Sequence, residues 1–159
     1  MNIVYLLLGS NQMDPAAQLQ KAQEAIEKMI GTIERRSSIY QTAAWGNTNQ
    51  PDFLNQVIIV HSTLTAAQTM ATVLSIEKEM GRIRTEKNAP RIIDIDILFF
   101  NTEIIAASNL TVPHPEIQNR RFVLVPLNEL SPQLMHPLLH KTIHQLLRTC
   151  PDHLTVNKI

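Results

Sequence analysis

Two aspartates, Asp94 and Asp96, stand one residue apart in the otherwise apolar run Ile92 to Phe100. The run predicts a strand, and alternate side chains of a strand point to the same face of its sheet. Both carboxylates therefore share one face, with Cα atoms about 6.5 Å apart. Adjacent anions among apolar residues need counter-charge, and hard oxygen ligands in this arrangement suit two Mg²⁺ ions that bridge successive phosphates. The alternative interpretation is a solvated strand face. The residues expected on the opposite face are Ile93, Ile95, Ile97 and Phe99.

A basic stretch directly precedes the acidic strand. It contains Arg82, Arg84, Lys87 and Arg91, and guanidinium groups match phosphate oxygens in bidentate pairs. Beside a metal pair, such a cluster suits a polyphosphate, although an ordinary solvated loop is the alternative. The chain has no Gly-x-x-x-x-Gly-Lys-Ser/Thr loop, so it is not a P-loop kinase. Glu77 continues a helical apolar stripe and is either a partly buried functional group or the partner of a nearby arginine.

A few aromatic and amide side chains could form a ligand pocket. Phe53 and Phe122 could stack on the two faces of a flat heterocycle, although a lone Phe belongs to the core by default. Asn55 shares a strand face with Phe53, and its amide offers both a donor and an acceptor. Trp45 lies in a polar loop and could act as a lid.

The histidines give one candidate. His114 lies in a stiff Pro-His-Pro segment close to Arg120, and we expect it to contact substrate. A second set recurs every four residues, but Pro137 interrupts any continuous helix there, so we expect no zinc site. That set is His136, His140 and His144.

These residues need a scaffold, and hydrophobic periodicity with turn signals predicts one. Helices are expected after Asp14-Pro15 with a stop at Gly31, after the capping box at Thr65 with a stop at Gly81, and at Lys141–Cys150. The buried stripe of the second helix is expected at Met70, Val73, Leu74 and position 77. The expected strands are Ile3–Leu8, Ile33–Thr42, Phe53–Ser62 and Ile92–Phe100, with a short hairpin partner of the last at Glu103–Ala106 and another short strand at Phe122–Leu127.

This β-α-β-β-α-β order predicts a ferredoxin-like α+β sandwich with an antiparallel sheet and a C-terminal extension. Both helices should cover one face of the sheet, which leaves the other face free for a ligand. The 159 residues are 44% hydrophobic, and we expect a single domain over 1–159.

The charge balance and the cysteine count limit the classes of binding partner and the cellular compartment that the sequence allows. The chain has 14 basic and 14 acidic residues, and their interspersion argues against general binding to nucleic acid or to an anionic membrane. One cysteine and the lack of a signal-like or membrane-spanning stretch indicate a cytoplasmic protein. We expect a monomer.

Several short motifs, in this order, resemble the 6-hydroxymethyl-7,8-dihydropterin pyrophosphokinase family over about residues 3 to 137. Each motif is weak alone, and the ordered set is specific. The motifs are Leu8-Gly9-Ser10-Asn11, Ser37 through Tyr40 to Thr42, Gln50-Pro51-Asp52-Phe53-Leu54-Asn55, Ile76-Glu77, Gly81-Arg82-Ile83-Arg84, Pro90-Arg91-Ile92-Ile93-Asp94-Ile95-Asp96-Ile97-Leu98, Leu110-Thr111-Val112-Pro113-His114-Pro115, Asn119-Arg120 and Phe122-Val123-Leu124.

The resemblance implies a ferredoxin-like fold and a reaction in which the pterin hydroxymethyl group attacks the β-phosphorus of ATP and AMP leaves. Asp94 and Asp96 are then ligands of two Mg²⁺ ions, and they form the catalytic set with Arg82 and Arg91. Asp96 is also a candidate general base. The implied pterin site comprises Thr42, Ala43, Ala44, Trp45, Phe53, Asn55 and Phe122. The implied ATP contacts are Glu77, Arg82, Arg84, Arg91, Ile97, Thr111, His114 and Arg120.

Two departures and two rival functions accompany this expectation. Ala43-Ala44 stands where the family pattern has a proline, and Asn88-Ala89 stands where many members carry Trp-Gly. Segment 82–91 is expected to close over ATP. A nucleotidyltransferase with the same carboxylate pair would release pyrophosphate instead of AMP, and a ferredoxin-like binding module would not turn over ATP at all.

Overall fold

The fold is described from a computed structural model that covers residues 1–44, 46, 49–82 and 90–159. The predicted roles of Trp45, Arg84 and Lys87, and the departure at Asn88-Ala89, lie outside these described residues.

Three long strands make the centre of the sheet. They are β1 (Asn2–Ser10), β4 (Phe53–Ser62) and β5 (Asp94–Phe100). β1 lies between β5 and β4 and pairs antiparallel with both. Its residues from Val4 to Ser10 are all buried, as expected of a strand with neighbours on both sides and both faces covered.

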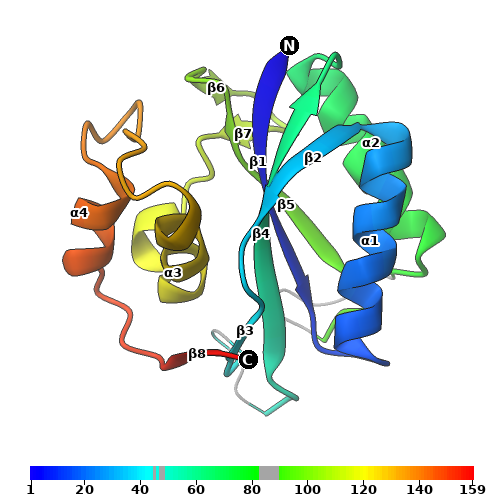
Figure 1. Ribbon diagram of the computed structural model, residues 1–159, viewed down its shortest axis with the longest axis horizontal. Helices are drawn as coiled ribbons and strands as arrows, with labels where there is room; N and C mark the ends of the chain where they lie inside the picture. Colours follow the sequence, from blue (N-terminus) through cyan, green and yellow to red (C-terminus); the bar gives the residue numbers. More distant parts are fainter. Residues whose placement is uncertain (45, 47–48, 83–89) are drawn as a thin grey trace.

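Shorter strands extend the sheet beyond β4. β2 (Gly31–Arg36) and β3 (Tyr40–Thr42) both pair with β4, and β8 (Val156–Lys158) pairs with β3. The predicted single strand over 33–42 is therefore two strands, separated by residues 37–39. Every pairing in this sheet is antiparallel, and the predicted ferredoxin-like α+β architecture is confirmed (Figure 1).

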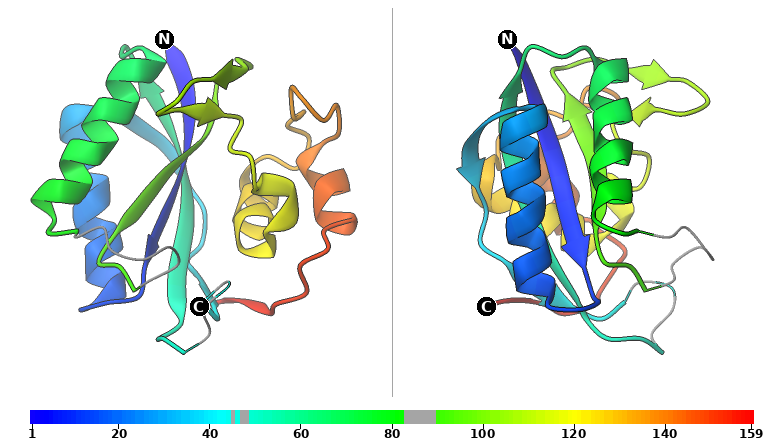
Figure 2. Two further views of the ribbon diagram at one scale, coloured as in Figure 1. Left: turned by 180° about the vertical axis from the view of Figure 1, so that it is seen from behind. Right: turned by 90° about the vertical axis from the view of Figure 1, so that its right-hand side faces the viewer.

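Two helices cover one face of the sheet, as the right-hand view of Figure 2 shows most directly. α1 (Pro15–Met29) begins at Asp14, whose side chain accepts from the Ala17 amide, and α2 (Ala66–Glu79) begins at a complete capping box on Thr65. The prediction placed Leu74 in the buried stripe, but Leu74 is 38% exposed. The buried side chains of α2 follow i, i+4, i+7 spacing from residue 69, and position 74 lies off that stripe. They are Thr69, Val73, Ile76 and Glu77.

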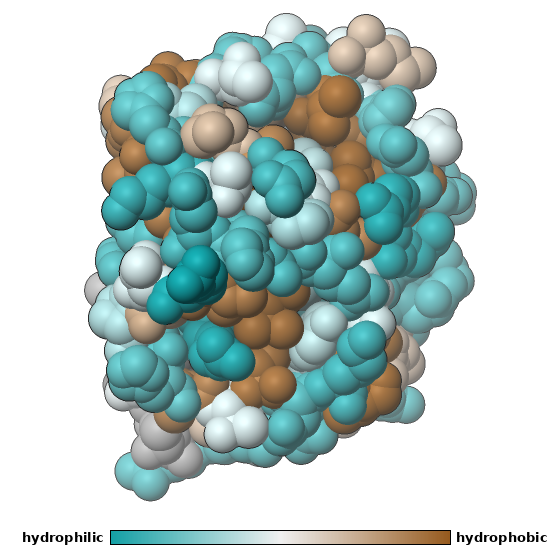
Figure 3. Space-filling model, turned by 60° about the vertical axis from the view of Figure 1, so that its left-hand side comes forward, coloured by the Kyte–Doolittle hydropathy of each residue, from teal (hydrophilic) through white to brown (hydrophobic). Residues whose placement is uncertain are grey.

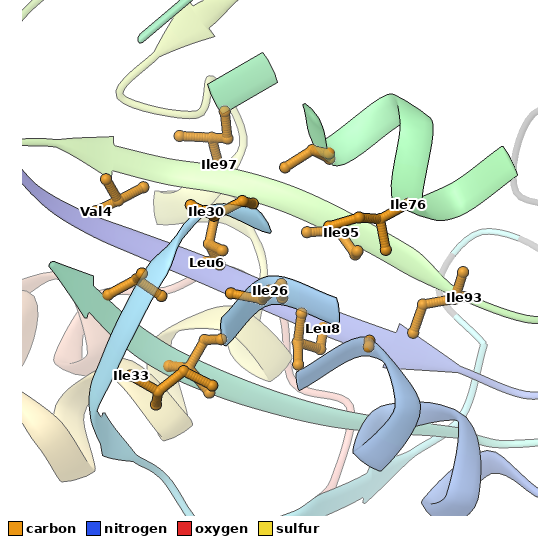
Figure 4. Packing of buried hydrophobic residues seen from close by; sticks show 14 of the residues in the cluster. Val4, Leu6, Leu8, Ile26, Ile30, Ile33, Ile76, Ile93, Ile95 and Ile97 are labelled. Carbon is orange, nitrogen blue, oxygen red and sulfur yellow. The ribbon is translucent and has the colours of Figure 1, made fainter. Parts of the chain in front are cut away.

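An apolar core fills the space between these helices and the sheet (Figure 4). Ile93, Ile95 and Ile97 point into it as predicted, but Phe99 does not. The register of β5 on β1 shifts between Ile97 and Phe99, so an extra residue, Leu98, reverses the alternation beyond it. Phe99 consequently packs on the opposite face of the sheet.

The second face of the sheet is also covered, so the prediction that it stays free for a ligand is wrong for most of its length. The short helix η1 (Ile117–Asn119), α3 (Arg121–Leu130) and α4 (Ile143–Arg148) lie on this side (Figure 1). The second apolar cluster joins them to the sheet, with Tyr5, Leu7, Val57, Ile59, Leu98 and Phe99 from the strands and Val123, Leu124, Leu127, Ile143 and Leu146 from the helices.

Two short strands were predicted incorrectly. Phe122–Leu127 lies in α3, where the buried residues Val123, Leu124, Leu127 and Leu130 follow helical spacing that a six-residue window with a proline hides. The segment after β5 forms β6 (Ile105–Ala106), which pairs with β7 (Thr111–Val112) and not with β5. The helix predicted over 141–150 is α4, with Ile143 and Leu146 inward as expected.

Gly31 begins β2 directly after α1, at a position where the neighbouring strand leaves no room for a side chain. A Cβ atom at this position would lie 2.0 Å from the His61 carbonyl oxygen of β4. Gly81, at the end of α2, instead needs its positive φ of 91°, and a Cβ there would make only an ordinary contact, 3.7 Å from Ile92 Cδ1.

We predict that Gly31→Ala destabilises the protein more than Gly81→Ala. The first change must displace backbone and should lower the free energy of unfolding by about 3 kcal/mol. The second imposes only left-handed backbone strain, about 1 kcal/mol. Urea unfolding of both variants measures the difference, and equal losses would contradict the steric account.

Candidate functional site

A hollow opens at the end of the sheet where β1 runs out and β4 and β5 begin. It contains about 520 Å³ of empty space, counting the solvent at its mouth. The residues that line it come from all three central strands, β3, and the start of α3. They are Leu7, Gly9, Thr42, Ala43, Phe53, Asn55, Arg91, Asp94, Asp96, Arg120 and Phe122.

This first hollow brings together most of the residues predicted for the pterin and the catalytic set. Leu7 and Gly9 also line it, although the sequence singled out neither as a site residue; for Gly9 the available signal was the glycine-serine turn after an apolar strand. Ala44 was predicted here, but it is buried and is not among the lining residues.

A second hollow lies on the other side of Asp96. Asp96 lines both hollows and so stands between them. Three residues predicted to contact ATP, Ile97, Thr111 and His114, line the second one. Its further lining residues, which the sequence did not single out as site residues, are Met70, Ile95, Ser108, Asn109, Leu110 and Pro115.

Asp94 is neutralised by two arginines. Arg82 Nη1 lies 2.7 Å from Asp94 Oδ1, and Arg91 Nη1 lies 2.9 Å from Asp94 Oδ2. The same Arg82 nitrogen lies 2.6 Å from Glu77 Oε2, which also accepts from the Ile95 amide at 2.8 Å. Glu77 is 3% exposed and lines neither hollow. It is therefore the buried partner of an arginine, one of the two alternatives from the sequence, and its contact with ATP stays a prediction.

Asp96 differs from Asp94 because its carboxylate makes no hydrogen bond or ion pair with any residue that the structure describes. The pKa of Asp96 is raised to about 8, first by burial and then by the charges of Asp94 and Glu77, with Arg120 and Arg91 opposing them. The carboxylate thus lies where added positive charge would be strongly favourable.

The donor set fits a hard divalent cation. Asp94 and Asp96 both line the first hollow, and carboxylate oxygens are the ligands that Mg²⁺ prefers, with waters and phosphates completing its shell. The described part of the chain holds no cluster of three or more His, Cys, Asp or Glu side chains suited to a metal. The fit therefore depends on this pair of aspartates.

Asn55 offers an unused donor to the first hollow. Its side chain is 3% exposed, and its Nδ2 has no hydrogen-bond partner among the described residues. A Cβ atom at Gly9 would lie 2.8 Å from Asn55 Oδ1. Any residue other than glycine would therefore displace the Asn55 amide. A buried amide donor without a partner costs free energy that a ligand acceptor would recover.

The two phenylalanines stand in different walls of the first hollow. Phe53 begins β4, and Phe122 lies in the first turn of α3. Each has an arginine over its ring: the Arg91 guanidinium carbon lies 5.6 Å from the Phe53 centroid, and that of Arg120 lies 5.9 Å from Phe122. Aromatic and cationic groups thus converge with the carboxylates.

Asn11 positions Arg91. The Asn11 side-chain oxygen Oδ1 accepts from the Arg91 backbone amide at 2.9 Å. The Asn11 backbone amide donates to the Arg91 carbonyl oxygen at 3.2 Å. Its Nδ2 donates to Gln50 Oε1 at 2.7 Å and to the Pro51 carbonyl oxygen at 3.0 Å. The Asn at the end of the turn after β1 therefore ties three separate segments together beside the site.

Two of the regularly spaced histidines are neighbours, since the His140 backbone amide donates to the His136 carbonyl oxygen at 2.9 Å. Burial and the nearby Arg120 charge lower the pKa of His114, whose Nδ1 accepts from the Glu116 amide at 3.1 Å. The neutral ring then carries its proton on Nε2. His136 is buried elsewhere, and only His144 of the regularly spaced set lies in α4.

Comparison with known proteins assigns the family. The family model described as 7,8-dihydro-6-hydroxymethylpterin-pyrophosphokinase (HPPK) matches residues 5–132. The chain belongs to the HPPK family.

The resemblance found in the sequence motifs is thereby confirmed, and HPPK relatives match nearly end to end. The 2-amino-4-hydroxy-6-hydroxymethyldihydropteridine pyrophosphokinase of Aquifex aeolicus is 39% identical over 91% of this chain and 90% of its own. The protein of the same name from Haemophilus influenzae is 36% identical over 94% and 93%.

Longer relatives contain the HPPK match as a part. In the crystal structure of wild-type HPPK-DHPS from Plasmodium falciparum, 93% of this chain superposes on 43% of that one, with a TM-score of 0.73 and 20% identity. This likeness supports the fold. A folic acid synthesis protein of Dictyostelium discoideum is 34% identical over 99% of this chain, which spans 24% of its length.

The buried carboxylate of Glu77 is expected to contribute to the stability of the fold. Glu77→Ala removes one of the two carboxylates paired with Arg82 and leaves the Ile95 amide without its acceptor, so it should lower the free energy of unfolding by about 3 kcal/mol. Glu27 is a matched control, because its 3.4 Å pair with Arg36 is half exposed, and Glu27→Ala should cost less than about 1 kcal/mol. Chemical denaturation tests this ordering, and a reversed order would contradict it.

Proposed function

We propose that this chain transfers the diphosphoryl group of ATP to the hydroxymethyl oxygen of 6-hydroxymethyl-7,8-dihydropterin and releases AMP, a step of folate biosynthesis. The observation that carries the proposal is the position of Asp96 between two hollows, in a chain of the HPPK family. One hollow suits a flat heterocycle, and the other suits a nucleotide.

The pterin ring is assigned to the first hollow. Phe53 and Phe122 supply faces for stacking on a planar ring. Asn55 Nδ2 is a donor without a partner among the described residues. The Thr42 hydroxyl, which makes a long 3.4 Å bond to the Ala43 carbonyl oxygen, can serve the ring edge. The proposed pterin contact of Ala44 has no support from the lining residues, and that of Trp45 lies outside the described residues.

ATP is assigned to the second hollow. Ile97 and Thr111 line it, and the neutral His114 can donate from Nε2 to an acceptor of the nucleotide. Arg120, which lines the first hollow, and Arg82 and Arg91 beside Asp94 are the proposed phosphate ligands.

Asp94 and Asp96 would hold two Mg²⁺ ions. When bound, these ions supply neutralisation of the phosphate charge and a fixed orientation of the polyphosphate. Arg82 and Arg91, which neutralise Asp94 in this structure, would then share their guanidinium groups with phosphate oxygens.

The chemistry is an in-line displacement. The hydroxymethyl oxygen bonds to the β-phosphorus, the bond from that phosphorus to the α,β-bridging oxygen breaks, the hydroxyl proton is lost, and AMP departs. Such a transfer depends on positioning and charge neutralisation more than on a covalent nucleophile. The chain's part is to hold the two reactants on either side of Asp96.

The setting of the reaction completes the proposal. No helix among the described residues is long and apolar enough to cross a membrane, and on the face drawn in Figure 3 hydrophilic residues interrupt the hydrophobic patches. We propose a cytoplasmic monomer that forms a single domain over 1–159 and takes small-molecule substrates rather than nucleic acid.

Product analysis tests the proposed reaction. With ATP, Mg²⁺ and 6-hydroxymethyl-7,8-dihydropterin, we expect AMP and the pterin diphosphate in equal amounts, and no AMP when the pterin is left out. A chelator in excess of Mg²⁺ should abolish turnover. Release of pyrophosphate would identify a nucleotidyltransferase, and intact ATP under every condition would favour a binding module.

Asp96→Asn tests the acidic pair. The neutral amide keeps the size of the side chain but removes the charge that would hold a cation, so kcat/KM should fall about a thousandfold. Asp14→Asn is the matched control, because asparagine also caps a helix well and residue 14 lies outside both hollows. Undiminished turnover by Asp96→Asn would remove the proposed role of the pair.

A further inference from the structure

The two walls of the pterin hollow come from separate parts of the chain. One wall is the β3–β4 pair, in which Thr42 lies opposite Phe53 and Tyr40 lies opposite Asn55. The other wall is the start of α3, which carries Phe122. The gap between the two rings therefore depends on how α3 is held against β3 and β4.

A carboxylate of α3 reaches β3 and the turn before it. Glu129 Oε1 accepts from the Tyr40 hydroxyl at 2.6 Å. The Ser38 amide donates to both carboxylate oxygens, at 3.0 and 3.1 Å, and the Ser38 hydroxyl donates to Oε2 at 3.1 Å. Glu129 lies two helical turns after Phe122, so these bonds join the two walls through one rigid helix.

The ionisation states favour these bonds. Burial would raise the pKa of Glu129, but the hydrogen bonds from Tyr40 and Ser38 outweigh it and lower that pKa. Burial, followed by the Glu129 contact, raises the pKa of Tyr40 to about 12. Near neutral pH the acceptor is charged and the donor keeps its proton, which is the stronger class of hydrogen bond.

The C-terminal segment crosses the same gap. Asp152 Oδ2 accepts from the Arg121 amide at 3.0 Å, next to Phe122, and the following β8 pairs with β3 so that Val156 lies opposite Thr42. Figure 1 shows this segment running from α4 to the edge of β3. The two walls are thus connected a second time, through the C-terminal segment.

We propose that Glu129 and Tyr40 are positioning residues for the pterin, because their hydrogen bond sets the placement of β3 and β4 relative to Phe122. The inference rests on the proposed function of this hollow. Neither residue lines the hollow, so any effect on the ligand passes through Thr42, Asn55 and the two rings.

The rest of α3 is docked without this contact. Its apolar residues pack on the sheet, and two further side-chain bonds hold the same helix end: Tyr5 to Ser131 at 2.7 Å and Arg35 to the Leu130 carbonyl oxygen at 2.9 Å. These two reach β1 and β2, and neither touches β3. Glu129 is therefore expected to govern the position of β3 more than the docking of the helix.

The only two tyrosines of the chain provide a matched test. Tyr40→Phe and Tyr5→Phe each remove one hydroxyl that ties a strand to the end of α3, and both rings are buried. We expect Tyr40→Phe to raise the Kd for 6-hydroxymethyl-7,8-dihydropterin about tenfold, measured with a non-hydrolysable ATP analogue and Mg²⁺ present. The Kd for the analogue alone should change by less than about twofold, and Tyr5→Phe should leave both constants similarly unchanged.

Glu129 variants complete the test. Glu129→Ala should weaken pterin binding at least as much as Tyr40→Phe, whereas Glu129→Gln, which keeps one acceptor oxygen, should restore part of it. The double variant Tyr40→Phe/Glu129→Ala should be no weaker than Glu129→Ala alone, because both changes remove the same bond. KM for the pterin should rise in parallel, with a smaller change in kcat.

The outcomes separate this inference from the proposed function. If the unmodified protein binds the pterin but Tyr40→Phe and Tyr5→Phe have equal effects on its Kd, the bond is only structural and the inference fails. If the unmodified protein binds no pterin, the proposed function fails and the inference fails with it. Thermal unfolding of all variants confirms that the proteins compared are folded.

Discussion

The candidate site depends on an uneven distribution of positive charge between two carboxylates on one strand. Asp94 receives two guanidinium groups, whereas Asp96, on the same strand face, makes no ion pair with any described residue. Partial burial of a carboxylate that has no directly paired cation among the described residues is unfavourable, and Asp96 has this environment at the point where the two hollows meet. Glu77 stabilises the pair of Arg82 and Asp94, because it accepts hydrogen bonds from both Arg82 and the backbone of β5. Arg82 and Arg91, which lie in the described segments before and after residues 83–89, both pair with Asp94.

The sequence predicted the shared strand face of the two aspartates because strand alternation is a local property. Period-two alternation placed Asp94 and Asp96 on one face. The N-cap at Asp14-Pro15 and the capping box at Thr65 placed the two covering helices. Thr42, Phe53, Asn55 and Arg91 converge on the first hollow as the family resemblance implied. Their roles in binding and catalysis stay predictions, since their position alone does not test them.

The features that the sequence did not predict are tertiary. One extra residue at Leu98 moved Phe99 to the other face, and no periodicity in a nine-residue strand reveals a bulge. The helical spacing of α3 was hidden because the apolar window is short and Pro126 argues against a helix interior. The bonds of Glu129 to Ser38 and Tyr40 span about ninety residues of sequence, and a surface glutamate in a helix gives no signal of such partners.

Pairing register shows how one sheet serves both as a core and as a site. Across the strands Asp94 lies opposite Gly9, and Gly9 lies opposite Asn55. These three residues form one transverse row on the floor of the first hollow.

The neighbouring row toward α3 is Asp96, Leu7 and Val57, and the residues beyond it pack in the second apolar cluster. The boundary between core and hollow therefore crosses three strands at the same level, and Leu7 belongs to both. A polar row needs one small residue where two polar side chains approach from either side, and Gly9 meets that need because a Cβ there would strike Asn55. On the α3 side of the sheet, the hollow lies where the residues change from large and apolar to small and polar. The register of the strands aligns these small and polar residues in one row.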